Sequence, residues 1–385
     1  MIVAGEASGD AHAAKLVGAL RENSLETAFE FFGATGQKMR DAGVETILDA
    51  DNLAIVGLPE IARALPMFWN AFQKLKIEAV KRKPDVVILV DFPDFNLKLA
   101  KSLKKRNLKI VYYISPQLWA WRRYRVRTIE KYVDLLLAIL PFEKSWYEKQ
   151  GIRHVEYVGN PLAREVFSNL TKEDFCRKYN LDSAKPIVAL LPGSRQKEIH
   201  RILPALLETA ALMWRKNNDL QFVVALASKE KTAEIETIIE KTKQNDLKLP
   251  DVLIIAAEET REVLNASDAA AVTSGTATLE TAIIGTPLAI VYKTSGFNYK
   301  LLRPLISVEH FGLINLIARE RLAKELIQND FTPDALAEEL FRLLEPETNK
   351  KMREKLKEIT DALGSGGASK RAAEYILNFI KQPKA

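Results

Sequence analysis

The stretch SGTATLETAIIGTP, residues 274–287, decides the fold predicted for this chain. The five residues before it, AAAVT at 269–273, form a short apolar run typical of a buried strand. After the small polar loop, about ten residues have helical character, and Gly285 followed by Pro287 predicts where the helix ends. The stretch is therefore predicted to be a strand, a tight loop and a helix, which is the repeating unit of a parallel α/β fold.

The loop at the start of this helix is a candidate phosphate site. The first N–H groups of a helix lack internal partners and carry partial positive charge, which favours an anionic group. Gly275 lets a ligand approach the backbone, Ser274 and Thr276 can donate from their hydroxyls, and Glu280 one turn later can accept from a ribose hydroxyl. These features describe a site for a nucleotide diphosphate. The alternative is that SGT only caps the helix and Glu280 is solvated, and the residues of this stretch leave both open.

Length and composition predict a two-domain globular protein. The chain has 385 residues, of which 47% are hydrophobic, and contains one cysteine, Cys176. A single cysteine excludes an intramolecular disulfide framework and agrees with a reducing compartment. The four histidines are scattered without ligand spacing, which disfavours a zinc site.

Charge and hydropathy restrict the partners and the location. The net charge of +6 suits an anionic partner, either nucleic acid or an acidic lipid surface. Arginines and tryptophans at 114–125 can in principle stack bases, but they lie inside a βα series without a recognition motif, so no nucleic acid is expected. The longest apolar run, 135–142, is less than about half a membrane span, and we expect neither a signal peptide nor a spanning helix. The expected location is cytoplasmic.

The first half of the chain repeats the βα pattern. The segment IVA at 2–4 predicts a strand, and GEASGD at 5–10 predicts a loop before a helix. This loop lacks the G-x-G-x-x-G spacing of a dinucleotide site, so we expect its glycines to form a tight turn beside a substrate cleft. Glu6 and Ser8 lie in this loop and are therefore candidate contacts to the substrate.

A carboxylate follows the next buried strand. The run VVILV at 86–90 is fully apolar, as in parallel sheets, and Asp91 comes directly after it. Ligands in open α/β sheets gather at the carboxyl ends of strands, so Asp91 is a candidate general base. Asp94 fits an acidic residue in the first turn of the following helix, where the helix dipole attracts negative charge. A purely structural role stays open for either residue.

Residues 61–83 combine bulky apolar side chains with lysines and arginines. A helix of this composition fits a membrane interface, where aromatics enter the acyl region and cations meet anionic headgroups. The alternative is an ordinary amphipathic helix packed on its own core. The candidate membrane contacts are Leu65, Met67, Phe68, Trp69 and Phe72.

The βα pattern restarts after a turn signal at 159–161. A strand at 187–191 leads into PGSRQKEI, where Gly193 permits close approach and Arg195 offers a fork of donors matched to phosphate, or is only a solvated loop arginine. Asn315 lies in a loop entering a helix. The predicted domains are 1–160, 161–350 and a pair of terminal helices at 351–385, the last of which is expected to cross back to the first domain.

Six motifs follow one another along the chain: GEASGD at 5–10, VDFPDFN at 90–96, ISPQLWAWR at 114–122, LPFEK at 140–144, LLPGSRQKEI at 190–199 and SGTATLE at 274–280. Together they resemble the lipid-A-disaccharide synthase family, whose members have the GT-B fold of two Rossmann-like, doubly wound α/β domains facing across a cleft. The resemblance covers essentially the whole chain in order.

The resemblance implies an enzyme. Members of the family transfer 2,3-diacylglucosamine from UDP to the 6-hydroxyl of 2,3-diacylglucosamine 1-phosphate, with inversion and release of UDP. They act on the cytoplasmic face of the bacterial inner membrane, with UDP-sugar as a substrate and without a cofactor or metal. The first Asp of their D-x-P-D-F-N motif falls on Asp91, Arg195 and Asn315 match functional positions, and the 274–276 loop with Glu280 resembles the nucleotide site of related UDP-sugar enzymes.

Two departures and three rival functions accompany this hypothesis. Little sequence precedes the first strand, and Phe92 stands where a smaller residue is common in the family. A UDP-GlcNAc 2-epimerase or another GT-B transferase would share the nucleotide site without the cluster at 65–72, and a membrane adaptor would need that cluster without Asp91 or Arg195. A nucleic-acid-binding function would explain the net positive charge but none of the other features. Acyl-chain preference, oligomeric state and domain closure do not follow from the sequence.

Overall fold

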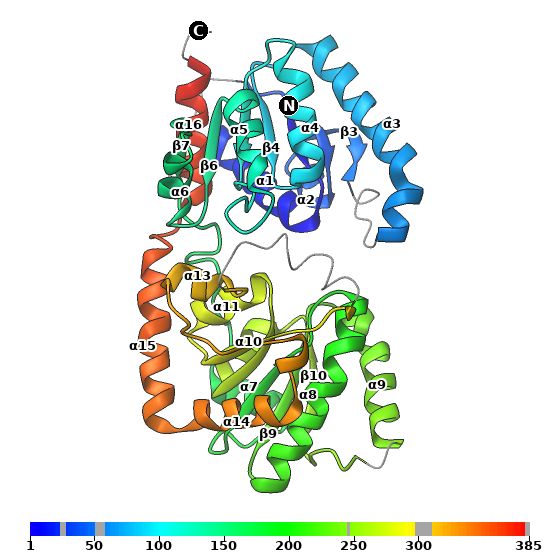
Figure 1. Ribbon diagram of the computed structural model, residues 1–385, viewed down its shortest axis with the longest axis vertical. Coiled ribbons are helices and arrows are strands. Elements are labelled where there is room, and N and C mark those ends of the chain that lie inside the picture. Colours follow the sequence, from blue (N-terminus) through cyan, green and yellow to red (C-terminus); the bar gives the residue numbers. More distant parts are fainter. Residues whose placement is uncertain (24–27, 51–57, 245–246, 297–309, 382–385) are drawn as a thin grey trace. The chain divides into compact units, whose positions relative to one another are not determined.

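The computed structural model describes residues 1–23, 28–50, 58–244, 247–296 and 310–381, with the side chains of 58–65 excluded. The chain forms two compact units, each built on one parallel sheet (Figure 1). The first unit comprises Met1–Pro161 and Ser365–Ala385, and the second comprises Leu162–Gly364. The terminal segment predicted from 351 onward is therefore divided between the two units.

The first unit contains β1 (Ile2–Ala4), α1 (Ala7–Glu22), β2 (Phe32–Thr35), α2 (Gln37–Asp41), β3 (Glu45–Asp49), α3 (Leu58–Arg82), β4 (Val87–Val90), α4 (Pro93–Lys104), β5 (Ile110–Tyr113), α5 (Val126–Tyr132), β6 (Leu135–Ala138), α6 (Glu143–Lys149), β7 (Val155–Tyr157) and α16 (Ala368–Lys381).

The sheet of the first unit has the order β3-β2-β1-β4-β5-β6-β7, and its pairs are parallel. The order runs outward in both directions from the β1–β4 pair, so the topological switch point lies there. Every residue of β1 and β4 is buried, as expected for strands covered on both faces. The carboxyl ends of these two strands lead into the 5–10 loop and into Asp91.

The last helix completes one face of this sheet. Ala372, Ala373 and Ile376 of α16 are buried in the same apolar cluster as Leu16 and Val17 of α1. Small residues on α16 let the two helices approach closely, and Arg371 Nε donates to the backbone oxygen of Val158 at 2.8 Å. Residues from the end of the chain thus form part of the core of the first unit.

The second unit contains α7 (Lys172–Tyr179), β8 (Ile187–Leu191), α8 (Gln196–Lys216), β9 (Gln221–Leu226), α9 (Thr232–Gln244), β10 (Leu253–Ala257), α10 (Thr260–Ala266), β11 (Ala269–Thr273), α11 (Thr276–Ile284), β12 (Leu288–Tyr292), α13 (Leu313–Ala318), β13 (Glu325–Ile327), α14 (Pro333–Leu344) and α15 (Pro346–Ala362).

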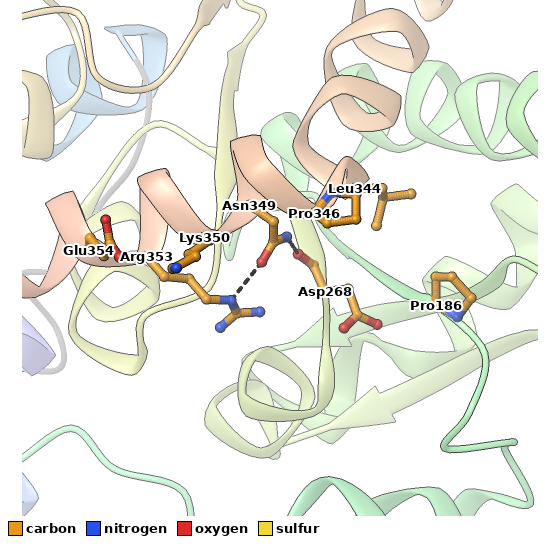
Figure 2. Close-up of a pocket in the computed structure, with 8 residues that line it drawn as sticks. All are labelled: Pro186, Asp268, Leu344, Pro346, Asn349, Lys350, Arg353 and Glu354. Carbon is orange, nitrogen blue, oxygen red and sulfur yellow. Dashed lines mark hydrogen bonds between the residues drawn. The ribbon is translucent and has the colours of Figure 1, made fainter.

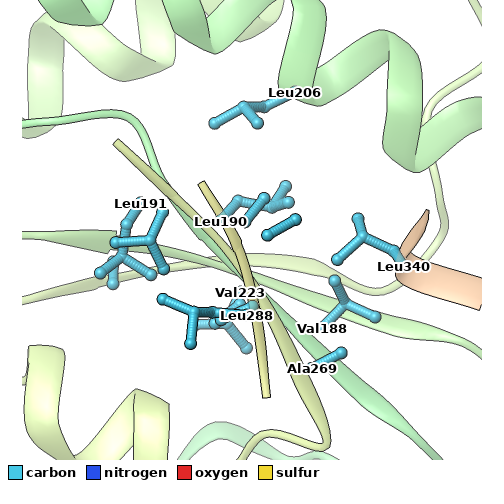
Figure 3. Close-up of a cluster of buried hydrophobic side chains, with 14 of the residues drawn as sticks. Val188, Leu190, Leu191, Leu206, Val223, Ala269, Leu288 and Leu340 are labelled. Atoms are coloured by element: carbon cyan, nitrogen blue, oxygen red, sulfur yellow. The ribbon is translucent and has the colours of Figure 1, made fainter. Parts of the chain in front are cut away.

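The sheet of the second unit has the order β10-β9-β8-β11-β12-β13, again parallel, with its switch point between β8 and β11. Figure 3 shows its core, in which Leu206 of α8 and Leu340 of α14 pack with sheet residues that include Val188 and Val223. The predicted strand, loop and helix at 269–284 is confirmed. Gly285 ends α11 in the left-handed conformation, at φ 89°, which glycine adopts without steric cost.

Candidate active site

A pocket of about 640 Å3 lies at the switch point of the second unit, beyond the carboxyl ends of β8 and β11. The hydroxyl of Thr273 donates to the backbone oxygen of Leu191 at 2.8 Å and joins these two strand ends. The pocket brings together most of the residues predicted to bind nucleotide or phosphate. Those lining it are Arg195, Ser274, Gly275, Thr276 and Glu280.

Two helices begin at this pocket. The residues that precede α8 and α11 are Arg195 and Gly275, and neither provides a side-chain hydrogen bond to cap its helix. Neither residue therefore satisfies the first N–H groups of its helix through a side chain, and unsatisfied N–H groups at a helix start favour an anion. A Cβ atom built on Gly275 would meet no protein atom within 4 Å, so the space beside this backbone is open to a ligand.

Arg195 presents its guanidinium at the mouth of the pocket. Its side chain is 61% exposed and makes one long contact, from Nη1 to Oε1 of Glu198 at 3.3 Å. Gly193 has φ 101°, and a Cβ atom there would lie 2.8 Å from Oε2 of Glu198. The loop after β8 thus needs glycine at 193 to keep Glu198 and Arg195 in place.

Glu280 is held by a residue that the sequence reasoning did not identify. Arg261, at the start of α10, places Nη2 3.3 Å from Oε1 of Glu280 and donates from Nη1 to the backbone oxygen of Glu165. Arg261 also lines the pocket and adds a second cation to it. No motif marks Arg261. Its position in the sequence, shortly after the carboxyl end of β10, was the one feature that could have identified it.

Asn315 lies outside the group of residues that line the pocket. Its side chain is fully buried, donates to the backbone oxygen of Ala323 and to Oε1 of Glu325, and accepts from the N–H of Ala323. Glu325 in turn accepts from the N–H groups of Phe311 and Gly312, and the oxygen of Phe311 accepts from the hydroxyl of Ser274 at 3.3 Å. Within the described residues, these hydrogen bonds connect Asn315 to the pocket indirectly, through Glu325 and the 311–312 backbone.

Substituting Asn315 with alanine is expected to lower the free energy of unfolding by roughly 2–4 kcal/mol, because it leaves buried partners unpaired. Urea unfolding followed by circular dichroism measures this change. The affinity for the nucleotide diphosphate that the sequence predicts as ligand, measured on the folded fraction, should fall less than about tenfold, as expected for an indirect role. Unchanged stability with a complete loss of nucleotide binding would instead mean that the amide contacts the nucleotide.

Asp91 lies at the switch point of the first unit, directly after β4. Its backbone is left-handed, with φ 47°, and its backbone oxygen accepts from Nδ2 of Asn96 at 2.8 Å and from the hydroxyl of Tyr112 at 2.7 Å. Burial and the nearby carboxylate of Glu6 raise the pKa of Asp91 to about 6. A carboxyl group with this pKa can accept a proton near neutral pH.

The loop after β1 faces the same switch point. Glu6 and Ser8 are exposed at the start of α1. Gly5 is covered by the ring of Phe92, which lies 2.3 Å from the position of a Cβ atom at residue 5. Glycine at 5 therefore leaves room for the ring of Phe92.

The predicted membrane-contact cluster separates into exposed and inward-facing members. The side chain of Trp69 is 62% exposed, and its ring stacks on Phe72 with the centroids 6.1 Å apart. Phe68 and Phe72 also contact Phe95 and, with Met67, pack against the core of the first unit. The side chain of Leu65 lies outside the described residues.

A second pocket in the second unit lies at the opposite ends of the strands. Figure 2 shows its polar groups, of which Arg353 bonds to Asn349, and Asn349 bonds to the backbone oxygen of Asp268. Arg353 also donates to the backbone oxygens of Gly285 and Ser267. These hydrogen bonds attach α15 to the sheet, so we assign this pocket a structural role.

Two further findings concern the described part of the chain. No cluster of three or more His, Cys, Asp or Glu residues with the geometry of a metal site occurs within it. Within the same residues, no helix is both long enough and apolar enough to span a bilayer.

Two doubly wound units, each with polar groups at its switch point, define a protein of the GT-B class. Solved structures share this fold across almost the whole chain. A UDP-GlcNAc 2-epimerase from Neisseria meningitidis, crystallised with UDP-GlcNAc, has a TM-score of 0.61 at 14% identity, covering 96% of this chain and 97% of its own. A glycosyltransferase from Rickettsia africae has a TM-score of 0.58 at 16% identity, covering 99% and 98%.

The family model for lipid-A-disaccharide synthetase matches residues 1–379. The lipid-A-disaccharide synthase of Trichlorobacter lovleyi is 42% identical over 383 residues, which are 99% of this chain and 97% of that protein. The chain belongs to the lipid-A-disaccharide synthase family. It is therefore a glycosyltransferase that acts in the formation of the lipid A disaccharide. The family resemblance inferred from its motifs is confirmed.

Proposed function

We propose that this enzyme transfers 2,3-diacylglucosamine from its UDP donor to the 6-hydroxyl of 2,3-diacylglucosamine 1-phosphate, forming a β-1,6 link with inversion and releasing UDP. Family membership supports the reaction class. The observation that carries the mechanism is Asp91, whose pKa is raised to about 6 at the switch point of the first unit. We assign the acceptor to the first unit and the donor nucleotide to the pocket of the second.

The reaction needs one proton transfer and one displacement. Asp91 accepts the proton of the acceptor 6-hydroxyl while that oxygen attacks the anomeric carbon from the face opposite to UDP. The bond between the anomeric carbon and the UDP oxygen breaks, and the configuration inverts. Glu6, which raises the pKa of Asp91, makes the carboxylate a stronger base.

The leaving group is stabilised in the second unit. Negative charge grows on the diphosphate as UDP departs, and the starts of α8 and α11 together with Arg195 offer donors to it. Thr276 can add a hydroxyl donor, and Glu280, oriented by Arg261, can accept from the ribose. The proposal assigns UDP-sugar the role of substrate and includes no cofactor or metal.

We also propose that the enzyme works on the cytoplasmic face of the inner membrane as a peripheral protein, because both substrates carry acyl chains. Within the cluster at 65–72, the exposed Trp69 is the strongest candidate for contact with lipid. Phe68 and Phe72 pack inward, so their replacement would also disturb the core.

The test of the reaction uses an acceptor that lacks only the 6-hydroxyl. With this 6-deoxy analogue, we expect no disaccharide by mass spectrometry, whereas the normal acceptor is converted. Product formed from the analogue would mean that another hydroxyl attacks and would overturn the β-1,6 assignment.

The pH dependence of kcat/KM provides a separate prediction about Asp91, because kcat/KM reports the pKa values of the enzyme without substrate. Since the carboxylate is the active form, kcat/KM should fall about tenfold per pH unit below pH 6. Glu6→Gln removes the neighbouring negative charge and should move this fall to lower pH. A profile that is flat between pH 5 and 8, or one that Glu6→Gln leaves in place, would contradict the role of Asp91.

A further inference from the structure

Helix α3 exposes large apolar side chains along one face. Trp69, Ile77 and Val80 are 62%, 60% and 42% exposed, and their spacing of eight and three residues places them on the same side of the helix. Among the described residues, only three other large hydrophobic side chains are comparably exposed, and these are scattered: Tyr124, Phe167 and Tyr375. The apolar exposure of α3 is therefore concentrated rather than random.

The same helix face ends at a basic pocket. This pocket of about 500 Å3 lies at the C-terminal end of α3, where Val80 and Lys83 form part of its wall. Asp85 and Lys109 precede β4 and β5, so the pocket is at the end of the sheet opposite to Asp91. Its lining contains four cations, Lys83, Arg106, Lys109 and Lys381, against one carboxylate, Asp85.

The wall of the pocket is built from three helix ends. Lys109 Nζ donates to the backbone oxygens of Phe379 and Ile380 at 3.3 and 3.1 Å, which attaches the end of α16 beside β5. Arg106 donates to the backbone oxygen of Ser102 at 2.7 Å, at the end of α4. The Lys109 bonds hold the segment that carries Lys381 beside β5, and the Arg106 bond fixes that side chain against the end of α4.

We propose that this pocket binds the phosphate headgroup of an anionic phospholipid while the exposed face of α3 lies along the bilayer; this rests on the proposed location at a membrane. The cations match a lipid phosphate in charge. Val80 belongs both to the pocket wall and to the apolar face, so a bound headgroup leaves its acyl chains beside apolar side chains. A soluble anion has no acyl chains and would not contact the exposed apolar face of α3. Trp69 lies near the middle of the 25-residue helix and Val80 near its C-terminal end, about 16 Å apart along the axis, so contacts at both positions fix the direction of the helix on the membrane.

The experiment compares two triple variants of the full chain. The pocket variant carries Lys83→Gln, Arg106→Gln and Lys381→Gln. The control carries Lys241→Gln, Lys350→Gln and Lys351→Gln, which remove the same charge from exposed positions of the second unit. Binding is measured by sedimentation with vesicles of phosphatidylglycerol and phosphatidylcholine in equal parts, and with phosphatidylcholine alone.

We expect the pocket variant to bind the mixed vesicles at least about 30-fold more weakly than the wild type, since each cation at an anionic surface contributes roughly a fivefold gain. The control should lose less than about fivefold. Neither variant should lose affinity for pure phosphatidylcholine, and both should keep wild-type transferase activity in detergent.

Equal losses in both variants would mean that net charge alone attracts the vesicles, and this would overturn the proposal. Wild-type vesicle binding by the pocket variant would overturn it too. This holds even if the same variant loses saturable binding of inorganic phosphate, because the pocket would then bind a soluble anion rather than a lipid headgroup. If the wild type lacked transferase activity in detergent but bound phosphatidylglycerol through the pocket, the proposed reaction would be wrong and the lipid site would be supported.

Discussion

Replacing Asp91 with asparagine is expected to slow disaccharide formation by about 10²–10⁴-fold, the usual contribution of a general base. The amide has nearly the same shape as the carboxyl group but cannot accept the proton of the acceptor hydroxyl. UDP binding should stay at the wild-type level, because the nucleotide is assigned to the pocket of the other unit. Product is measured by mass spectrometry and UDP binding by calorimetry.

The same variant should be more stable than the wild type at neutral pH. The folded state raises the pKa of Asp91 from 3.8 to about 6, so it favours the protonated form. The penalty for ionising the buried group is absent below about pH 4 and complete above about pH 6, where it is on the order of 3 kcal/mol. Asparagine avoids this penalty and tolerates the left-handed backbone at φ 47°.

Asp94→Asn is the matched control, since it makes the same change three residues later. Asp94 accepts from Arg122 and Arg125, and these arginines lower its pKa. Its replacement should weaken this surface ion pair and leave kcat within about tenfold of the wild type. If Asp91→Asn retained kcat, or if Asp94→Asn lowered it equally, the assignment of the base would be wrong.

Replacing Arg195 with alanine is expected to weaken UDP binding by about 10–100-fold, the usual loss for a hydrogen bond to a charged group. The exposed guanidinium has one long contact with Glu198, so little of its function is structural. Because it stabilises charge that grows on the leaving group, kcat should fall as well. Titration with UDP and steady-state kinetics measure the two effects.

Arg201→Ala provides the control for this prediction. Arg201 is also an exposed arginine, in the second turn of α8, but is not among the residues that line the pocket. Its loss should leave UDP affinity within about twofold, as expected for a distant surface charge. Equal weakening by both variants would mean that Arg195 acts through general charge rather than through contact with the diphosphate.

Much of the fold followed from the sequence because its central strands are fully buried. β8 and β11 have the predicted bounds, 187–191 and 269–273, and all of their residues are buried. The edge strands β3 and β13 were not predicted. They are partly exposed, so ETILD and ELI lack the continuous apolar run that marks a central strand.

The candidate site was partly predictable for a related reason. Residues in a loop directly after a buried strand, such as Asp91 and Arg195, can be placed from the sequence because strand ends define the switch point. Arg261 was missed because only the folded chain brings α10 beside Glu280. The inward packing of Phe68 and Phe72 depends on Phe95, which no local periodicity reveals. The catalytic and nucleotide-binding roles themselves stay predictions.

The central claim is tested most directly by analysing the product that the purified enzyme makes from UDP-2,3-diacylglucosamine and 2,3-diacylglucosamine 1-phosphate in detergent. Mass spectrometry should detect the tetraacyl disaccharide 1-phosphate together with free UDP, and NMR of that product should show a β-1,6 link. An enzyme that binds UDP but forms no disaccharide from this pair, or forms one with retained configuration, would contradict the account.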